Sequence, residues 1–167
     1  MEARGFNVAE EGHLVSVLSP QNATGGVAGT VFNMKNAAKV NIVIQFGALA
    51  AALGAITLNA CSNIAGAGAT AIPFTYYQQV TAGNANDTLE LNGSTPSTVF
   101  AATAAGFTPT DAANTFVILV VQADQLPAGL PYLQLEIANG ANADYVSALA
   151  ILTGLAYPGT QQPTATT

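Results

Sequence analysis

Charged residues are missing from the whole stretch between Lys39 and Asp87, and this limits what the chain can fold into. So long a neutral stretch is either a membrane helix or a series of strands that bury at least one face. Its first part, residues 40–46, alternates between apolar residues and polar ones such as Asn41 and Gln45. A period of two with several β-branched residues predicts a strand that faces a core. We therefore expect short strands, and no membrane helix, across residues 40–58.

The same kind of segment returns further along the chain. Residues 116–121 are apolar at every position, which predicts a central strand covered on both faces. Residues 132–137 alternate between apolar and polar, and Gly, Asn and Pro residues separate the segments. Short strands of this kind predict an all-β fold, either an antiparallel β-sandwich or a jelly-roll-like barrel. Further strands are expected at residues 55–60, 70–78, 88–92 and 145–153, the last of them buried.

The two ends of the chain differ from this middle part. Asn7 can cap a helix, and Glu10 stands three residues later, as in a capping box. Residues 1–20 are therefore expected to form a short N-terminal helix or arm, ahead of a single β domain at residues 21–158. Residues 159–167 lack core-forming side chains, which predicts a flexible tail.

Charge and composition restrict the partners of the protein. The chain has 3 basic and 9 acidic residues, so its formal net charge is −6 and only 7% of its residues are charged. About 25% is usual in soluble proteins. Nucleic-acid binding is not expected, because contacts with phosphate need several Lys or Arg residues. A partner can cover a surface made of Asn, Gln, Thr, Ser and Ala without stripping ions of water, so the composition favours a component of an assembly.

Residue types that do chemistry are scarce in this chain. His13 is the only histidine and Cys61 the only cysteine, so no intrachain disulfide forms and His13 is expected to be a half-exposed residue without a catalytic role. Residues 84–90 offer several oxygen atoms but lack the spacing of a known calcium loop, which favours a solvated turn. We expect no enzymatic activity, no cofactor and no metal site.

Three segments taken together resemble a known family. They are residues 38–47, residues 69–76 and residues 146–158. In pattern and composition they resemble the capsid decoration proteins of tailed bacteriophages, which are also called cement or auxiliary head proteins. The resemblance implies a small β-rich structural protein, commonly a homotrimer, that binds the outside of the assembled phage head. It also implies that the partner is the major capsid protein, whose neighbouring subunits such a protein bridges.

Location and contact residues follow from the same resemblance. The protein is expected on the outer surface of the virion after synthesis in the host cytoplasm, and the start of the chain has acids where a secretory signal has a basic start. Residues 1–20 correspond by position to the arm that such proteins lay on the shell. We expect apolar side chains of this arm to contact the shell or a neighbouring copy; the alternative is that they close the protein's own core. These candidate contact residues are Phe6, Val8, Leu14 and Val17.

Carbohydrate binding is the competing function. A β-sandwich of a phage head fibre or tail would attach to host glycans through exposed aromatic rings beside polar side chains. Tyr76, Tyr77 and Tyr132 are the candidates for such rings. Exposure of these rings beside Asn or Asp side chains would favour this alternative over shell binding.

Overall fold

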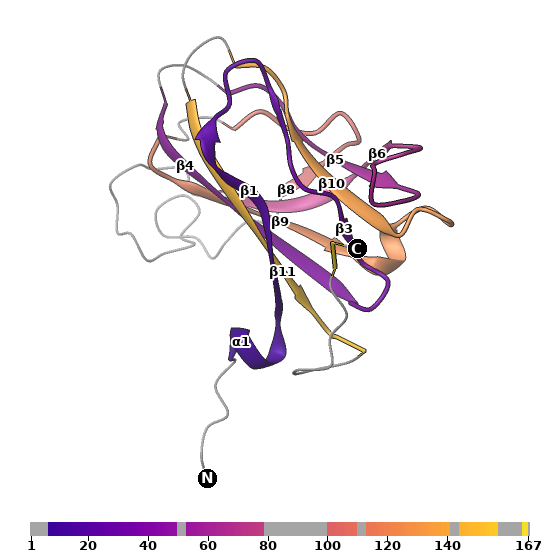
Figure 1. The fold of residues 1–167 in the computed structure, drawn as a ribbon. Helices are drawn as coiled ribbons and strands as arrows, with labels where there is room; N and C mark the ends of the chain where they lie inside the picture. The colour runs from indigo at the N-terminus through magenta and orange to yellow at the C-terminus, as the bar shows by residue number, and fades with distance from the viewer. Residues whose placement is uncertain are drawn as a thin grey trace.

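The computed structural model describes residues 7–49, 53–78, 100–109, 113–140, 144–156 and 165–166. In these residues the chain forms two antiparallel sheets (Figure 1). Side chains of both sheets belong to one hydrophobic core. Helical structure is limited to the short helix α1 (Val8–Glu11) and the 3-10 turn η1 (Ala123–Gln125) within the described part of the chain. The predicted all-β sandwich is confirmed.

Each sheet has a defined strand order. The larger sheet has six strands in the order β1 (His13–Asn22), β11 (Asp144–Thr153), β4 (Lys39–Leu49), β9 (Phe116–Gln122), β7 (Phe74–Gln78) and β8 (Phe100–Ala102). The smaller sheet has five strands in the order β2 (Val27–Ala28), β10 (Tyr132–Ile137), β5 (Ile56–Cys61) and β6 (Thr70–Ile72), with β3 (Phe32–Asn33) also paired to β10.

The strand pairs are nested along the sequence. The first strand pairs with the last, β2 and β3 pair with β10, β4 pairs with β9, and β5 pairs with β6. This is the connectivity of a jelly roll, in which one long hairpin folds over into two sheets. The chain passes from the smaller to the larger sheet at Pro73, between β6 and β7, where a residue without an N–H interrupts the ladder.

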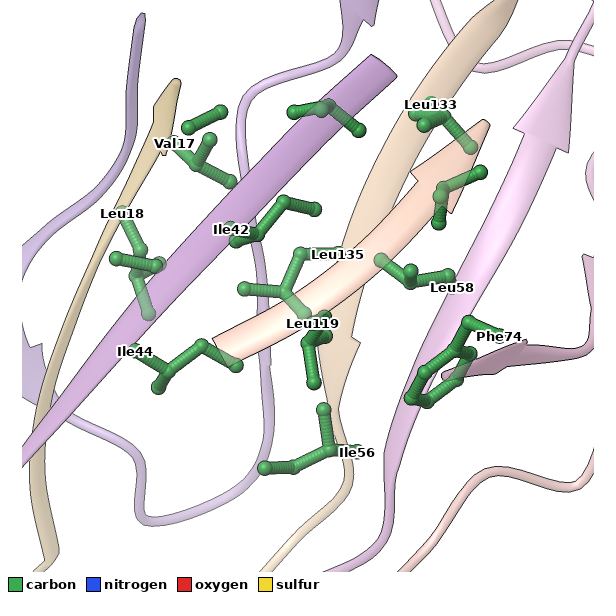
Figure 2. Packing of buried hydrophobic residues seen from close by; sticks show 14 of the residues in the cluster. Val17, Leu18, Ile42, Ile44, Ile56, Leu58, Phe74, Leu119, Leu133 and Leu135 are labelled. Atoms are coloured by element: carbon green, nitrogen blue, oxygen red, sulfur yellow. The ribbon is translucent and has the colours of Figure 1, made fainter. Parts of the chain in front are cut away.

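Branched aliphatic side chains from both sheets fill the space between them. Figure 2 shows Ile42, Ile44 and Leu119 of the six-stranded sheet beside Leu58 and Leu135 of the five-stranded sheet, and all five are fully buried. Successive side chains of a strand point to opposite faces, so alternate apolar residues reach the same core. The alternation read from residues 40–46 and 132–137 therefore predicted the inward faces of β4 and β10 correctly.

The described residues of the neutral stretch after Lys39 form strands. They are β4, which continues to Leu49, β5, which begins at Ile56, and then β6 and β7. Among the described residues no helix is long and apolar enough to cross a membrane.

The N-terminal helix is shorter than the capping pattern suggests. Asn7 does cap it, since its side-chain oxygen accepts a hydrogen bond from the N–H of Ala9 at 3.1 Å, but the helix ends at Glu11. Residues 13–20, expected within the arm or helix, belong to β1 and pair with β11. The β-branched Val15 and Val17 have low helix propensity and pack well on a sheet, so pairing with β11 outweighs the helical signal.

Two further expectations concern residues 88–92 and the tail. The strand expected at residues 88–92 lies outside the described residues. In the tail expected at residues 159–167, Ala165 is only 7% exposed and its carbonyl accepts a hydrogen bond from the N–H of Asn33 at 2.6 Å. At Ala165 the tail is therefore packed against the sandwich.

Candidate interaction face

The outward side of the six-stranded sheet is rich in apolar side chains, and we call it the outer face. Strand register aligns Leu14, Ile151, Asn41, Val120 and Thr75 in one row across five strands. A second row runs two residues further along each strand. Its members are Ser16, Leu149, Val43, Ile118 and Tyr77. Adjacent rows of this kind form a continuous surface, because side chains in register on one face are neighbours.

The most exposed part of the outer face lies on β1 and β11, which are neighbours in Figure 1. Leu14 is 45% exposed, Leu149 is 40% exposed and Tyr145 is 58% exposed. The only other large apolar side chains exposed to this degree among the described residues are Ile64 and Phe100, which do not belong to these strands. Clusters of exposed apolar side chains on a sheet mark interaction surfaces more often than single ones do.

Charge is nearly absent from the outer face. Among its described positions on β1, β11, β4, β9 and β7, only Lys39 carries a charge, and it lies at the first position of β4 beside Gln122 and Thr153. Removing an ion from water costs several kcal/mol when no partner compensates it. A partner can therefore cover the two rows, which contain no charged residue, without that cost.

A shallow hollow of about 260 Å³ lies beside Tyr145. Gly47 forms part of it, and a Cβ atom at this position would come within 3.3 Å of the Cβ of Tyr145. The absence of a side chain at Gly47 therefore keeps the hollow open next to the most exposed ring of the outer face. The remaining lining residues are Pro20, Gln45, Phe46, Val146 and Ser147.

The outward side of the five-stranded sheet has a different character. Gln134 and Glu136 of β10 and Thr57 of β5 point outward there. Gln134 is held in place because its side-chain amide donates a hydrogen bond to the carbonyl of Gly29 at 3.2 Å. Polar and charged side chains thus lie on this side of the sandwich, whereas the described outer face is richer in apolar side chains and has Lys39 as its single charge.

The four candidate contact residues lie in different environments. Leu14 is on the outer face, and Val8 of α1 is half-buried beside Gly12, which the side chain of Ile151 also approaches. Val17 is only 1% exposed and belongs to the protein's own core, which was the alternative considered for these residues. Phe6 lies outside the described residues.

The sequence interpretation missed the residues of β11 that complete the outer face. Residues 145–153 were expected to be a buried last strand, but Tyr145 and Leu149 are exposed and Ile151 is half-buried. Their alternate neighbours Val146, Ala148 and Ala150 fill the core. In a two-layer sandwich each strand can bury only one of its two faces in the core. The apolar residues on both faces of this strand were therefore the signal from which an exposed apolar face could have been predicted.

The side chains considered for catalysis or metal binding lie apart from one another. His13 is half-buried at the start of β1, whereas Cys61 is buried at the end of β5. Burial raises the pKa of the Cys61 thiol, and the negative charge of Glu136 raises it further. The described residues contain no group of three or more His, Cys, Asp or Glu side chains that could hold a metal ion. Residues 84–90, considered above for calcium, are outside the described ranges.

The candidate sugar-binding tyrosines are not exposed rings. Tyr76 stacks on Phe107 at a centroid distance of 3.8 Å and on Phe100 at 5.3 Å. Both rings are nearly parallel to that of Tyr76, and burial raises the pKa of its hydroxyl. Tyr77 and Tyr132 are half-buried. Tyr76 is thus part of an aromatic stack at the border of the core, where its ring packs against Phe107 and Phe100.

Comparisons with protein-family models, with curated proteins and with solved structures found no match for this chain.

Proposed function

We propose that this protein is a capsid decoration protein, which binds the outside of an assembled phage head and bridges neighbouring major capsid subunits. The observation that carries the proposal is the outer face, an apolar and nearly uncharged surface on a sandwich whose opposite side is polar. Such a module has one side suited to contact with protein and one suited to water.

The dimensions of the outer face suit a bridging role. Five strands take part in its two rows, and with about 4.8 Å between neighbouring strands the rows extend roughly 19 Å. A surface of this width can lie across the boundary between two subunits of a shell. Each copy need contribute only modest binding energy, because a ligand that binds the assembled shell alone shifts the equilibrium toward assembly, and many copies act together.

Binding to undecorated capsids tests this proposal. Leu149→Asp places a charge in the most exposed part of the outer face, on β11, and we expect it to lower capsid occupancy at least about ten-fold, since an uncompensated buried charge costs several kcal/mol. Ile64→Asp is the matched control, because Ile64 is 38% exposed, close to the 40% of Leu149, and lies in the loop after β5. Co-sedimentation with purified capsids measures both variants.

Two results would contradict the proposal. One is wild-type protein that does not bind capsids, and the other is Leu149→Asp binding as well as Ile64→Asp. If the wild-type protein instead binds glycans on an array, and Leu149→Asp binds them equally, the carbohydrate-binding alternative gains support. The stacking of Tyr76 on Phe107 and Phe100 speaks against that outcome.

A further inference from the structure

The C-terminal end of the chain lies against the edge of the five-stranded sheet. Strand β3 pairs with β10 on one side through Phe32 and Asn33. The N–H of Asn33 instead donates to the carbonyl of Ala165 at 2.6 Å. Ala165 therefore occupies the position that a further strand beside β3 would take, which is how extended peptides add to a sheet edge.

The side chain of Ala165 also takes part in this contact. It is only 7% exposed and belongs to the hydrophobic core, whereas Thr166 next to it is exposed. The contact therefore has two components, a backbone hydrogen bond to Asn33 and a small apolar side chain that reaches the core. Neither component depends on which copy of the chain supplies the Ala165 segment.

The connection to Ala165 is longer than this contact requires. The N–H of Ala156 donates to the carbonyl of Asn36 at 2.9 Å, so the chain leaves β11 beside the turn that follows β3. Asn36 and Asn33 are three residues apart, which limits their separation to about 11 Å. The residues from 157 to 165 can span roughly 30 Å when extended. The excess length gives Ala165 access to sites beyond its own β3.

The composition of the tail allows it to approach another copy. Residues 157–167 contain no charged residue, although the whole chain has a net charge of −6. Two copies repel each other through their net charge, but a neutral tail does not add to that repulsion.

We propose that the edge of β3 is a docking site for the C-terminal segment of a second copy, so that neighbouring copies exchange their tails. A tail makes the same contacts whether it docks on its own chain or on a second copy. The ratio of these two forms therefore depends on the effective concentration of the tail. Exchange of an identical element between copies is a low-cost route to association. The inference rests on the proposed function in one respect, because decoration of a capsid would place copies next to one another. Between such neighbours, exchange of tails competes with docking of each tail on its own chain.

Cross-linking in solution, without capsids, tests tail exchange. The acceptor is the full chain with Lys35→Cys, two residues after Asn33, and with Ala165→Asp, which prevents docking of its own tail. The donor is the full chain with Thr166→Cys. A short bismaleimide joins the two exposed thiols, and the native Cys61 is buried and remains unreacted. Mass spectrometry identifies the donor–acceptor product.

We expect the donor–acceptor product to increase roughly ten-fold as the protein concentration rises from about 0.05 to 1 mM, because short flexible connections have effective concentrations in the millimolar range. A donor that also carries Ala165→Asp should lose the product. An acceptor with Ala101→Cys in place of Lys35→Cys measures random collision, because Ala101 is exposed on β8, the last strand of the other sheet.

A single chain with both Lys35→Cys and Thr166→Cys completes the experiment. Rapid cross-linking within this chain, with no donor–acceptor product above the Ala101→Cys control at any concentration, would overturn exchange. Absence of cross-linking within the chain would overturn the docking site itself. Neither result affects capsid binding by the outer face, so failure of this inference is distinguishable from failure of the proposed function.

Discussion

The side-chain oxygen of Asn22 accepts a hydrogen bond from the backbone N–H of Asp144 at 3.2 Å, across 122 positions of the sequence. The same oxygen accepts from the backbone N–H of Thr24 at 2.9 Å and from its hydroxyl at 2.7 Å. Asn22 is the last residue of β1, and Asp144 is the first residue of β11. One amide side chain therefore joins the end of the first strand to the start of the last strand.

Replacing this side chain should destabilise the fold. Asn22→Ala removes one acceptor of three hydrogen bonds, and we expect the free energy of unfolding to fall by about 1–3 kcal/mol. For a chain of this size that corresponds to a Tm lower by roughly 3–10 °C. Thermal unfolding followed by circular dichroism measures it, with Gln21→Ala, an exposed neighbour in β1, as the control. Equal losses in the two variants would contradict the role of Asn22.

A core leucine and a leucine of the outer face should respond differently to truncation. Leu135→Ala, in β10 opposite that sheet, leaves a cavity in the core and should cost about 2–5 kcal/mol. Leu149→Ala removes a side chain of the same type that is already 40% exposed, and it should cost less than about 1 kcal/mol. Chemical denaturation of the isolated protein measures both. A loss for Leu149→Ala as large as that for Leu135→Ala would show that the outer face is part of the core.

Gly106 places the aromatic stack next to β5. Its N–H donates to the carbonyl of Thr103 at 2.9 Å, and the following residue, Phe107, exchanges two backbone hydrogen bonds with Ile56. A Cβ atom at Gly106 would collide with the carbonyl oxygen of Ile56. We expect Gly106→Ala to displace Phe107 from Tyr76 and to weaken the near-ultraviolet circular dichroism of the tyrosines.

Gly129→Ala is the matched control for that variant. Gly129 has a φ of +82°, close to the +77° of Gly106, but no atom lies within 4 Å of a Cβ built there. The control therefore carries only the backbone strain of an L-residue at positive φ, about 1–2 kcal/mol. Gly106→Ala should lose clearly more stability than Gly129→Ala. Similar losses in both would mean that the contact with Ile56 adds nothing.

The sequence predicted which residues of β4 and β10 face inward, because alternation is a local property of a strand. It could not predict that β11 lies between β1 and β4, since many strand orders satisfy the same alternation. Leu149 shows the consequence most clearly. An apolar residue on the second face of a strand looks buried in the sequence, but Leu149 is 40% exposed, and none of the described strands forms a third layer over it.

The two ends of the chain were difficult to predict for a related reason. Asn7 capped a helix as expected, but pairing with β11 draws the chain into β1 from His13 onward. Ala165 lies in a polar tail whose composition does not predict a buried residue. Its methyl group is nevertheless buried, and its carbonyl accepts a hydrogen bond from the N–H of Asn33 in β3. Contacts of this kind depend on tertiary structure and leave no local pattern.

Stability at alkaline pH should depend on Cys61. Burial first, and Glu136 second, raise the pKa of its thiol above the ordinary value of 9.0. Below pH 9 the thiol is protonated in both the folded and the unfolded chain, so it does not change the balance between them. Above pH 9 the unfolded chain releases this proton more readily than the folded chain, so folding stability falls as the pH rises. Urea denaturation at pH 8.0, 9.0 and 9.8 measures the slope, and Cys61→Ala should show a smaller decrease over this range than the wild-type protein. Parallel slopes for the two proteins would mean that another group determines the alkaline loss.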